Sequence, residues 1–591
     1  MKNTLVDIRW ILLNFVNNPN IIDIQKFLFG LSFLFLIFTS FIYLAQNHLK
    51  FIKKNRYLLS DNIFIFSIIL FIIIGRWTSL LVPNVNPDES QFIAGAIKLF
   101  KDPVFWQSVD TGSSGPLNIF PLELPVYLGI RLEYASARLV ATLLVFISIL
   151  SLYYSLNIIY NKSIARSSVF LVVVTFSVMP IYDLKYYASE YVPIALLTLS
   201  LMAICFSYRY PKNELRIVSG LLLGAIPVAK FQGLPIAFAI VLLAIHIIWK
   251  QSQDKTEFSK SIVLLGLSFL IPSLIIFAYL IRFSLIDDFW KSYIQQNLLN
   301  YSSGTLKVVN NSTKSSHIGD HLGYIFNLFF STRVLFCLAA AMLIVLIPIL
   351  IYFQYFKIQK TKRSRSFYLI YYSILQLIFS LYAVLKPANQ FYHYLLFLII
   401  PCGFLIGVCL GELQIIAINS SLKKSLGNLP IKLLINFLLY IVIVGIAQGL
   451  FYIKYDDPNL LRREQLLKHY HGPLETAITQ IIHPGETMVV WGWAPELYVE
   501  TATIQGVRDA VPASAIIPSP LQKYYLKRFI DDLAKSSAPV FVDAVSPKMF
   551  TFHDPKTQEH EAFPELNKII TEKYKLVDNI DGVRIYKLNS P

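Results

Sequence analysis

The most constraining feature of this sequence is a series of long apolar runs that recurs from residue 27 to residue 453. A hydrocarbon core about 30 Å thick needs roughly 20 apolar residues for each helical crossing. Several runs reach this length, and 55% of the whole chain is hydrophobic. Helices of a water-soluble fold keep a polar stripe, which these runs lack. We therefore expect an α-helical polytopic membrane protein.

The apolar runs predict about 11 to 13 transmembrane helices. The expected spans are 27–45, 62–82, 135–159, 167–183, 191–208, 217–229 with 233–249, 262–283, 334–356, 367–385, 393–411 and 433–453. The run 217–249 is interrupted by Lys230-Phe231-Gln232-Gly233 and Pro235, which predicts a hairpin of two half-length helices. Broken backbone at membrane depth is tolerated where it is buried in protein or lines a cavity. We therefore expect the apex of this hairpin beyond the membrane or inside the protein.

The net charge of +16 is explained by the basic loops that set the orientation of the helices in the membrane. Basic residues gather in four short loops, 46–61, 209–216, 250–261 and 357–366. Short loops rich in Lys and Arg face the cytoplasm, and all four do so if 217–249 crosses the membrane twice. Three longer segments then lie outside, namely 83–134, 284–332 and the tail from 454. We expect no nucleic-acid partner for this charge.

The tail from residue 454 onward changes in character from apolar to polar. Its strand-like runs at 488–491 and 539–543 flank a helical stretch near 521–535. A strand–helix–strand order predicts a small α/β domain. We therefore expect a transmembrane domain over 1–453 and an extracytoplasmic domain over 454–591 that acts as a lid or docking module.

The first external segment carries two adjacent carboxylates, in Pro87-Asp88-Glu89. The amphipathic stretch 92–101 follows and is expected to lay its apolar residues toward lipid, which places Asp88 near the membrane–water boundary. An amphiphilic substrate presents its head group at that depth. A sugar hydroxyl attacks poorly unless a carboxylate takes its proton, and Asp88 is a candidate for this work. The alternative is that Asp88 caps the helix beginning near Glu89.

The order of several motifs resembles that of the GT-C glycosyltransferases, of the protein O-mannosyltransferase and aminoarabinose-transferase type. The first is Pro-Asp-Glu-x-x-x-x-Ala after the first helix of a core that has external loops and an outer C-terminal domain. The further matches are Gly115-Pro116-Leu117, Ala137-Arg138-Leu139, Tyr187-Ala188-Ser189-Glu190, Ala229-Lys230-Phe231-Gln232-Gly233-Leu234-Pro235, and His393-Tyr394-Leu395-Leu396 with Pro401. The resemblance implies a GT-C fold in which residues 1–453 form the catalytic domain.

The resemblance also implies a reaction and residues for it. The donor is a polyprenyl-phosphate sugar, and Asp88 is the catalytic base for attack with inversion at the anomeric carbon. Glu89 orients the acceptor or helps to hold a metal, and Glu190 positions the sugar or assists Asp88. The alternative for Glu190 is an interfacial carboxylate paired with Lys185. A divalent ion is possible at the adjacent carboxylates, although no His or third acid is spaced to complete a site.

The sequence departs from the family where the donor phosphate is bound. The family has a Lys or His before Pro-Pro in the first external segment, whereas this chain reads Gly-Ser-Ser-Gly-Pro. The phosphate then needs backbone N–H groups of this loop, around Ser114 and Gly115, or another cation. Arg138, Lys230 and His393 are the candidates, because a charge within a membrane segment is costly. Alternatively, Arg138 and Lys230 snorkel or pair with a loop carboxylate.

These observations favour an inverting glycosyltransferase of the bacterial plasma membrane, with its active site on the outer face. Its expected partners are the lipid-linked donor, membrane lipid and a lipid, glycan or protein acceptor. A transporter or flippase of a lipid-linked sugar is the alternative, which predicts paired repeats and charges in the middle of helices. A third possibility is an envelope-assembly protein that has kept the fold and lost activity, which the missing cation favours.

Overall fold

The structure is a computed structural model, and it describes residues 7–8, 21–45, 60–84, 86–178, 184–301, 368–387, 391–418, 429–455 and 472–589. The expected span 334–356 and the basic loop 357–366 lie outside the described residues, as do most of loop 46–61 and the part of segment 284–332 after residue 301.

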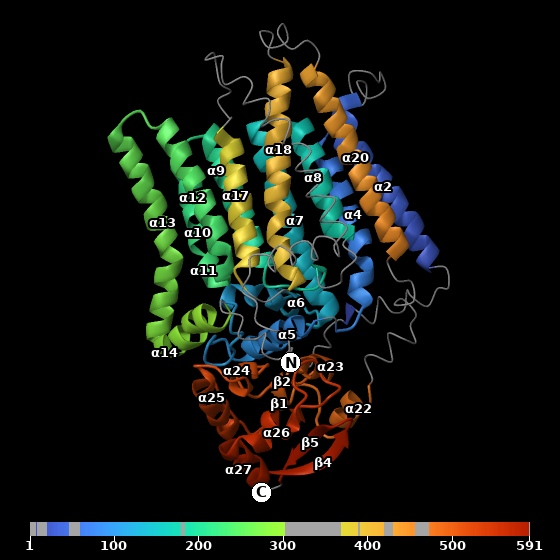
Figure 1. Ribbon diagram of the computed structural model, residues 1–591, viewed down its shortest axis with the longest axis vertical. Coiled ribbons are helices and arrows are strands. Elements are labelled where there is room, and N and C mark those ends of the chain that lie inside the picture. Colours follow the sequence, from blue (N-terminus) through green and yellow to red (C-terminus); the bar gives the residue numbers. More distant parts are fainter. Residues whose placement is uncertain are drawn as a thin grey trace.

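A bundle of long helices forms the upper part of the molecule (Figure 1). Its helices are α2 (Ile21–Ala45), α4 (Asp61–Leu81), α7 (Tyr134–Ile159), α8 (Lys162–Val178), α9 (Tyr191–Arg209), α10 (Asn213–Gly224), α11 (Ile226–Ala229), α12 (Leu234–Gln251), α13 (Lys255–Arg282), α17 (Tyr368–Leu385), α18 (Leu396–Ile418) and α20 (Leu429–Tyr455). Eight helical segments within the described residues are long and apolar enough to cross a membrane. The chain is therefore an integral membrane protein, as expected.

Helix α18 packs closely against α7 and α8. Small residues permit this approach. A Cβ atom added at Gly403 would lie 2.3 Å from Val172 Cγ2, and one at Gly407 would lie 2.4 Å from Leu156 Cδ1. Residues 396–413 of α18 are all buried, and the helix contacts α7, α8, α9, α17 and α20.

The break expected at Lys230 is present. Helix α11 ends at Ala229, and the short η5 (Phe231–Gly233) leads into α12. The segment Phe231–Gln251 is long and apolar enough to cross the membrane alone, so the prediction of two half-length helices was wrong for the second piece. Pro235 lies in the first turn of α12, where a missing N–H costs no hydrogen bond, and therefore does not shorten the helix.

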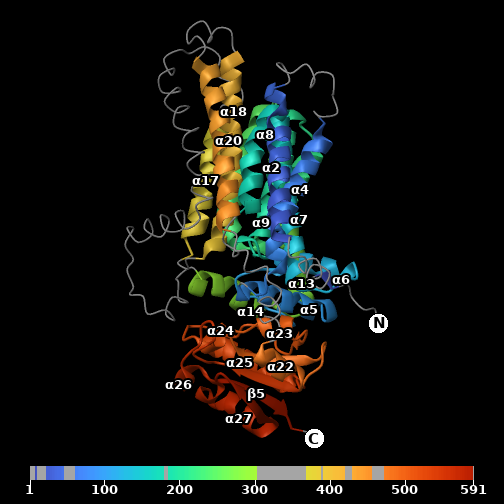
Figure 2. The same cartoon turned by 90° about the vertical axis from the view of Figure 1, so that its right-hand side faces the viewer.

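Short elements gather at one end of the bundle, between it and the C-terminal part of the chain (Figures 1 and 2). They are α5 (Pro87–Lys101), η2 (Pro116–Asn118), η3 (Phe120–Glu123), α6 (Leu124–Tyr127), α14 (Ile286–Asp288) and the π-helical η6 (Phe289–Tyr301). The expectation that α5 lays its apolar face on lipid was wrong. Phe92, Ile93 and Leu99 are buried within the protein because η3 and the C-terminal part cover α5 from two sides.

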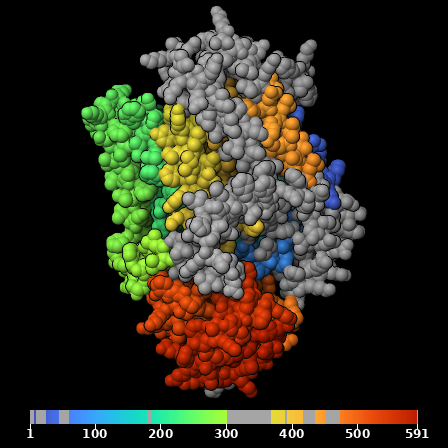
Figure 3. All heavy atoms as spheres, viewed as in Figure 1, coloured from blue at the N-terminus to red at the C-terminus, as the bar shows by residue number. Residues whose placement is uncertain are grey.

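Residues 472–589, here called the C-terminal unit, form a mixed sheet with helices and cap the end of the molecule (Figure 3). The elements are α22 (Pro473–Thr479), β1 (Thr487–Gly492), α23 (Glu496–Glu500), β2 (Ile504–Gln505), α24 (Ala513–Ile516), α25 (Gln522–Lys535), β3 (Val540–Ala544), α26 (Pro555–Gln558), η10 (His560–Ala562), α27 (Pro564–Lys573), β4 (Tyr574–Ile580) and β5 (Val583–Leu588). The strand order is β2-β1-β3-β5-β4. Strands β1 and β3 are parallel, with Met488 opposite Val540, so the predicted α/β architecture is confirmed.

Candidate active site

Asp88 lies in the first turn of α5, and a neighbouring residue caps the helix. Asn86 has extended backbone, and its side chain accepts a hydrogen bond from the Asp88 N–H at 2.8 Å. Pro87 then occupies the first helical position, where its fixed φ suits the helix. The interpretation of Asp88 as the helix cap was therefore wrong. Asp88 is half-buried, and it lines a cavity.

The cavity is lined by residues from three parts of the chain. Segment 83–134 and the adjoining ends of the membrane helices supply Asp88, Gln91, Phe92, Asp110, Thr111, Gly112, Ser113, Ser189, Lys230, Phe391, His393 and Tyr394. The C-terminal unit supplies Trp493, Asp509, Val511, Pro512, Ala513, Ser514 and Tyr525. Three residues singled out in the sequence, Asp88, Lys230 and His393, thus meet at one cavity.

Arg138 is placed by a dense set of hydrogen bonds away from the cavity lining. Its Nη2 lies 2.5 Å from Glu89 Oε2, and its Nε lies 3.0 Å from Glu89 Oε1. The Arg138 Nη1 donates to Ser79 O and Val82 O, and Nη2 also donates to Pro83 O. These carbonyls belong to the end of α4 and would otherwise lack intrahelical partners. Arg138 therefore ties the start of α5 to the end of α4.

Glu89 belongs to this buried arrangement and not to the cavity lining. It is fully buried, and its Oε1 accepts the Tyr187 N–H at 2.9 Å as well as the bonds from Arg138. Burial raises the pKa of Glu89, against the opposing effect of Arg138. The adjacent acids Asp88 and Glu89 are thus held in different surroundings, so they do not offer a joint pair of ligands to a metal ion.

Glu190, Lys230 and His393 form a second polar cluster. The ammonium of Lys230 pairs with the Glu190 carboxylate and donates to Ser189 Oγ at 2.6 Å. His393 Nε2 lies 4.0 Å from Glu190 Oε1, and its Nδ1 lies 3.0 Å from the Tyr186 hydroxyl. Burial alone would raise the pKa of Glu190, but Lys230 and His393 more than offset it and lower the pKa. Glu190 therefore holds a cation at the cavity wall.

Ser114 and Gly115 lie outside the cavity lining. The Gly115 N–H donates to Ala229 O at 2.8 Å. A Cβ at Gly115 would lie 2.0 Å from Val228 O, so the absence of a side chain lets this loop rest on the break before Lys230. Ser114 is buried beside it. The family-like Gly-Pro segment therefore packs against the break, and the preceding residues Gly112 and Ser113 line the cavity.

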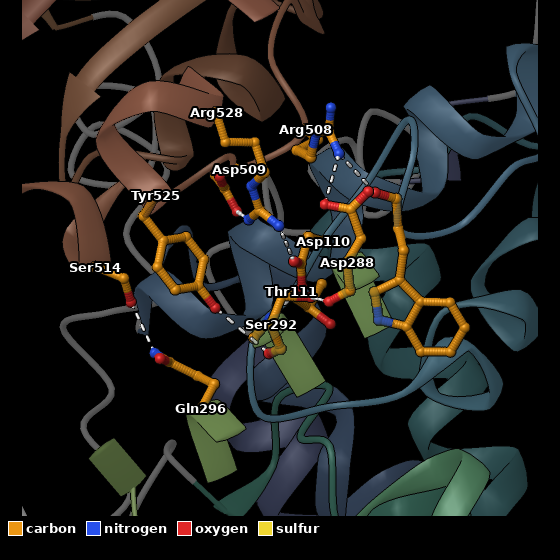
Figure 4. Close-up of polar contacts among 12 residues, drawn as sticks. Asp110, Thr111, Asp288, Ser292, Gln296, Arg508, Asp509, Ser514, Tyr525 and Arg528 are labelled. Atoms are coloured by element: carbon orange, nitrogen blue, oxygen red, sulfur yellow. Dashed lines mark hydrogen bonds and ion pairs between the residues drawn. The ribbon is translucent and has the colours of Figure 1, made fainter. Parts of the chain in front are cut away.

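Arg528 joins the C-terminal unit to segment 83–134 (Figure 4). Its Nη1 lies 2.7 Å from Asp110 Oδ2, and its Nη2 lies 2.5 Å from Asp509 Oδ1. The backbone adds to this contact, because the Asp110 N–H donates to Arg508 O at 2.8 Å. Burial raises the pKa of Asp509 to about 6, with Asp110 adding to the rise and Arg528 opposing it.

The C-terminal unit also contacts segment 284–301, which follows α13 (Figure 4). Gln296 Nε2 donates to Ser514 Oγ at 2.7 Å, and Arg508 Nη1 lies 3.4 Å from Asp288 Oδ1. Segments 83–134 and 284–301 therefore both support the part of the unit that reaches the cavity. Asp110 and Asp509 were not predicted as site residues, because each is an isolated acid without a motif.

One group with spacing suited to a metal ion occurs elsewhere among the described residues. Asp543, His560 and Glu561 place one ligand atom each within 4.8 Å of one another. Arg584 Nη2 lies 3.0 Å from Asp543 Oδ2 and already supplies a positive charge there. The group is in the C-terminal unit and is separate from the residues that line the cavity.

Comparison with known proteins identifies the fold. No family model and no curated protein matches the sequence. The crystal structure of ArnT from Cupriavidus metallidurans bound to undecaprenyl phosphate matches with a TM-score of 0.53 and 12% identity, covering 89% of this chain and 98% of that one. The apo structure of the same protein matches with a TM-score of 0.51 and 12% identity, covering 88% and 97%. The apo oligosaccharyltransferase of Archaeoglobus fulgidus matches more weakly, at 0.35 and 12% identity over 82% and 70%. The two ArnT structures show that this chain has the ArnT fold, which the order of its motifs predicted.

Proposed function

We propose that this protein is an inverting glycosyltransferase that moves a sugar from a polyprenyl-phosphate donor to an acceptor hydroxyl. The observation that carries the proposal is the cavity at the end of the bundle, where the carboxylate of Asp88 and the cation of Lys230 line the same space. A carboxylate to take a proton and a cation to receive a phosphate are the two groups that this transfer needs. The fold of ArnT, whose crystal structure holds undecaprenyl phosphate, supports a polyprenyl-phosphate ligand.

Asp88 acts as the general base in this proposal. The acceptor oxygen attacks the anomeric carbon of the sugar from the side opposite the phosphate, and Asp88 takes the hydroxyl proton as the new C–O bond forms. The bond between the anomeric carbon and the phosphate oxygen breaks, and its electron pair leaves with the polyprenyl phosphate. The configuration at the anomeric carbon is inverted because attack and departure occur on opposite faces.

Lys230 and His393 stabilise the leaving phosphate in this proposal. Lys230 is held at the cavity wall by Glu190 and Ser189, and His393 lies beside the same carboxylate. A preorganised cation needs no rearrangement when charge develops on the phosphate oxygens. Lys230 supplies the positive charge that the Gly-Ser-Ser-Gly-Pro stretch lacks, and His393 offers a ring nitrogen at the same cavity, whereas Arg138 and Gly115 have structural partners instead.

Glu89 and Glu190 act through other residues. Glu89 fixes the start of α5 through Arg138, which positions Asp88 one residue earlier. Glu190 fixes Lys230 and so positions the phosphate.

We further propose that the cavity and the C-terminal unit lie on the extracytoplasmic face of a bacterial plasma membrane, since the basic loops 209–216 and 250–261 are expected on the cytoplasmic face.

The reaction is tested with the purified full-length chain in lipid nanodiscs and undecaprenyl-phosphate sugars labelled in the sugar. The sugars are glucose, mannose and arabinose, and a total membrane-lipid and glycan extract supplies acceptors. We expect time-dependent transfer of the sugar label from at least one donor to acceptor material, with free undecaprenyl phosphate as the second product. Movement of the intact labelled lipid across proteoliposomes, with no cleavage of any donor, would instead establish a flippase and overturn the proposal.

A further inference from the structure

We propose that the C-terminal unit carries the subsite that recognises the sugar of the donor. Asp509, with Asp110 beside it, would accept hydrogen bonds from the sugar hydroxyls. The inference rests on the proposed function and extends it, because it assigns substrate recognition to a part of the chain outside the membrane bundle.

The cavity has two chemically different ends. Lys230, His393 and Ser189 come from the membrane helices, whereas Asp509 and the segment 511–514 come from the C-terminal unit. Helix α5, which carries Asp88, lies between the bundle and the C-terminal unit (Figures 1 and 2). One end of the cavity is therefore cationic and close to the membrane, and the other is acidic and further from it.

The order of groups in the donor matches the order of groups in the cavity. The polyprenyl chain remains in the hydrocarbon core, so the phosphate reaches the bundle end and the sugar extends beyond it toward the C-terminal unit. An ionised carboxylate is only a hydrogen-bond acceptor, and it suits the hydroxyl donors of a sugar. It does not suit a phosphate, whose like charge it repels. The acidic end of the cavity therefore fits the sugar better than the phosphate.

Asp509 and Asp110 form the acidic end of the cavity, here called the acidic wall. Both carboxylates are held in place before a ligand binds. Arg528 is buried between Asp110 and Asp509 and lies 4.6 Å from the centre of the Tyr525 ring (Figure 4). Arg528 donates a hydrogen bond to Oδ1 of Asp509. Within the described part of the chain, Oδ2 of Asp509 accepts no hydrogen bond. One arginine between two carboxylates leaves an excess of negative charge at this wall. A carboxylate held in this way forms strong hydrogen bonds to ligand hydroxyls without losing rotamer freedom on binding.

The test compares two ligands that differ only in the sugar. Equilibrium binding of tritiated undecaprenyl phosphate, and of the undecaprenyl-phosphate sugar that the parent protein cleaves, is measured on full-length protein in nanodiscs. Asp509→Asn should weaken binding of the sugar-bearing donor by roughly tenfold, about 1.4 kcal/mol, and leave binding of undecaprenyl phosphate unchanged. Lys230→Gln should weaken binding of both ligands, since both carry the phosphate.

Two further variants keep the test decisive. Asp531→Asn makes the same chemical change at an exposed position of α25 and should alter neither affinity. Ser514→Ala removes a hydroxyl from the same wall and serves as the second probe if Asp509→Asn fails to fold; it too should weaken only the sugar-bearing donor. An equal loss for both ligands, or no loss for either, would overturn the sugar subsite. A parent protein that binds and cleaves no donor would instead overturn the proposed function, so the two failures are distinguishable.

Discussion

Glu89 and Arg138 form a buried ion pair, with Arg138 Nη2 2.5 Å from Glu89 Oε2 and both side chains at most 1% exposed. The pair binds the first turn of α5 to the last turn of α4, while Asp88, next to Glu89 in sequence, lines the cavity. Two adjacent carboxylates therefore lie in separate surroundings. Glu89 is held in the buried ion pair, and Asp88 lines the cavity in which we propose that it acts.

Replacing Arg138 tests the structural side of this relationship. Arg138→Gln leaves the Glu89 carboxylate buried without its partner, which typically costs about 3–5 kcal/mol of stability. We expect a lower melting temperature in detergent and a smaller folded yield. The folded fraction should bind undecaprenyl phosphate as well as the parent does. Normal melting combined with greatly weakened phosphate binding would show that Arg138 meets the donor phosphate after all.

Lys230 is the cation to which we assign the phosphate. Lys230→Gln should weaken binding of undecaprenyl phosphate roughly 10- to 100-fold, because a hydrogen bond to a charged group is worth about 1.5–3 kcal/mol. The matched variant Glu190→Gln removes the positioning partner and keeps the cation, so it should weaken phosphate binding much less than Lys230→Gln does. Equal weakening in both variants would indicate that the pair only supports the fold.

The N-terminus of α5 offers a milder perturbation of the site. Asn86→Ala removes the cap from the turn that carries Asp88 and should cost about 1 kcal/mol of stability, whereas Asn86→Ser should restore most of it. Thermal melting of the three proteins measures the effect on stability. The rate of donor cleavage should fall in Asn86→Ala and recover in Asn86→Ser. Equal cleavage rates in all three proteins would show that other contacts position Asp88.

Much of the fold was predictable because it depends on local sequence. The length of the apolar runs indicated the membrane helices, the polar break indicated the chain interruption at Lys230, and runs rich in β-branched and aromatic residues indicated the strands at 488–491 and 539–543. The meeting of Asp88 with Lys230 and His393 was anticipated only through the resemblance to a family, since nothing local joins residues so far apart in the chain.

The remaining features depend on contacts between distant segments. Arg528 and Asp110 are 418 residues apart in sequence, and neither lies in a motif. The sequence therefore contained no indication that these residues meet at the acidic wall. The burial of α5 was missed for the same reason. Its apolar face at Phe92 and Ile93 has the same pattern whether lipid or protein covers it, and the C-terminal unit that covers it is distant in the chain.

Asp509 predicts a dependence of stability on pH. Its pKa is about 6 in the folded protein, above the ordinary value of 3.8. Between these values the folded state holds a proton that the unfolded chain has released, so the stability contributed by this residue falls as the pH rises. Asp509→Asn cannot titrate and should therefore lose less stability than the parent between about pH 4 and pH 7. The melting temperatures of the parent and of Asp509→Asn, measured across this pH range, should converge or cross. If the two curves of melting temperature against pH stay parallel, the raised pKa of Asp509 is contradicted.

The central claim is that Asp88 is the base of a glycosyl transfer. Asp88→Asn keeps the size of the side chain and removes its basicity, and Asp531→Asn makes the same change at an exposed position of the C-terminal unit. The most direct measurement is the single-turnover rate of undecaprenyl phosphate release from saturating donor by these two variants and the parent. We predict that Asp88→Asn slows release by roughly 100-fold or more with donor affinity unchanged, while Asp531→Asn matches the parent. Release by Asp88→Asn at the rate of the parent would contradict the account.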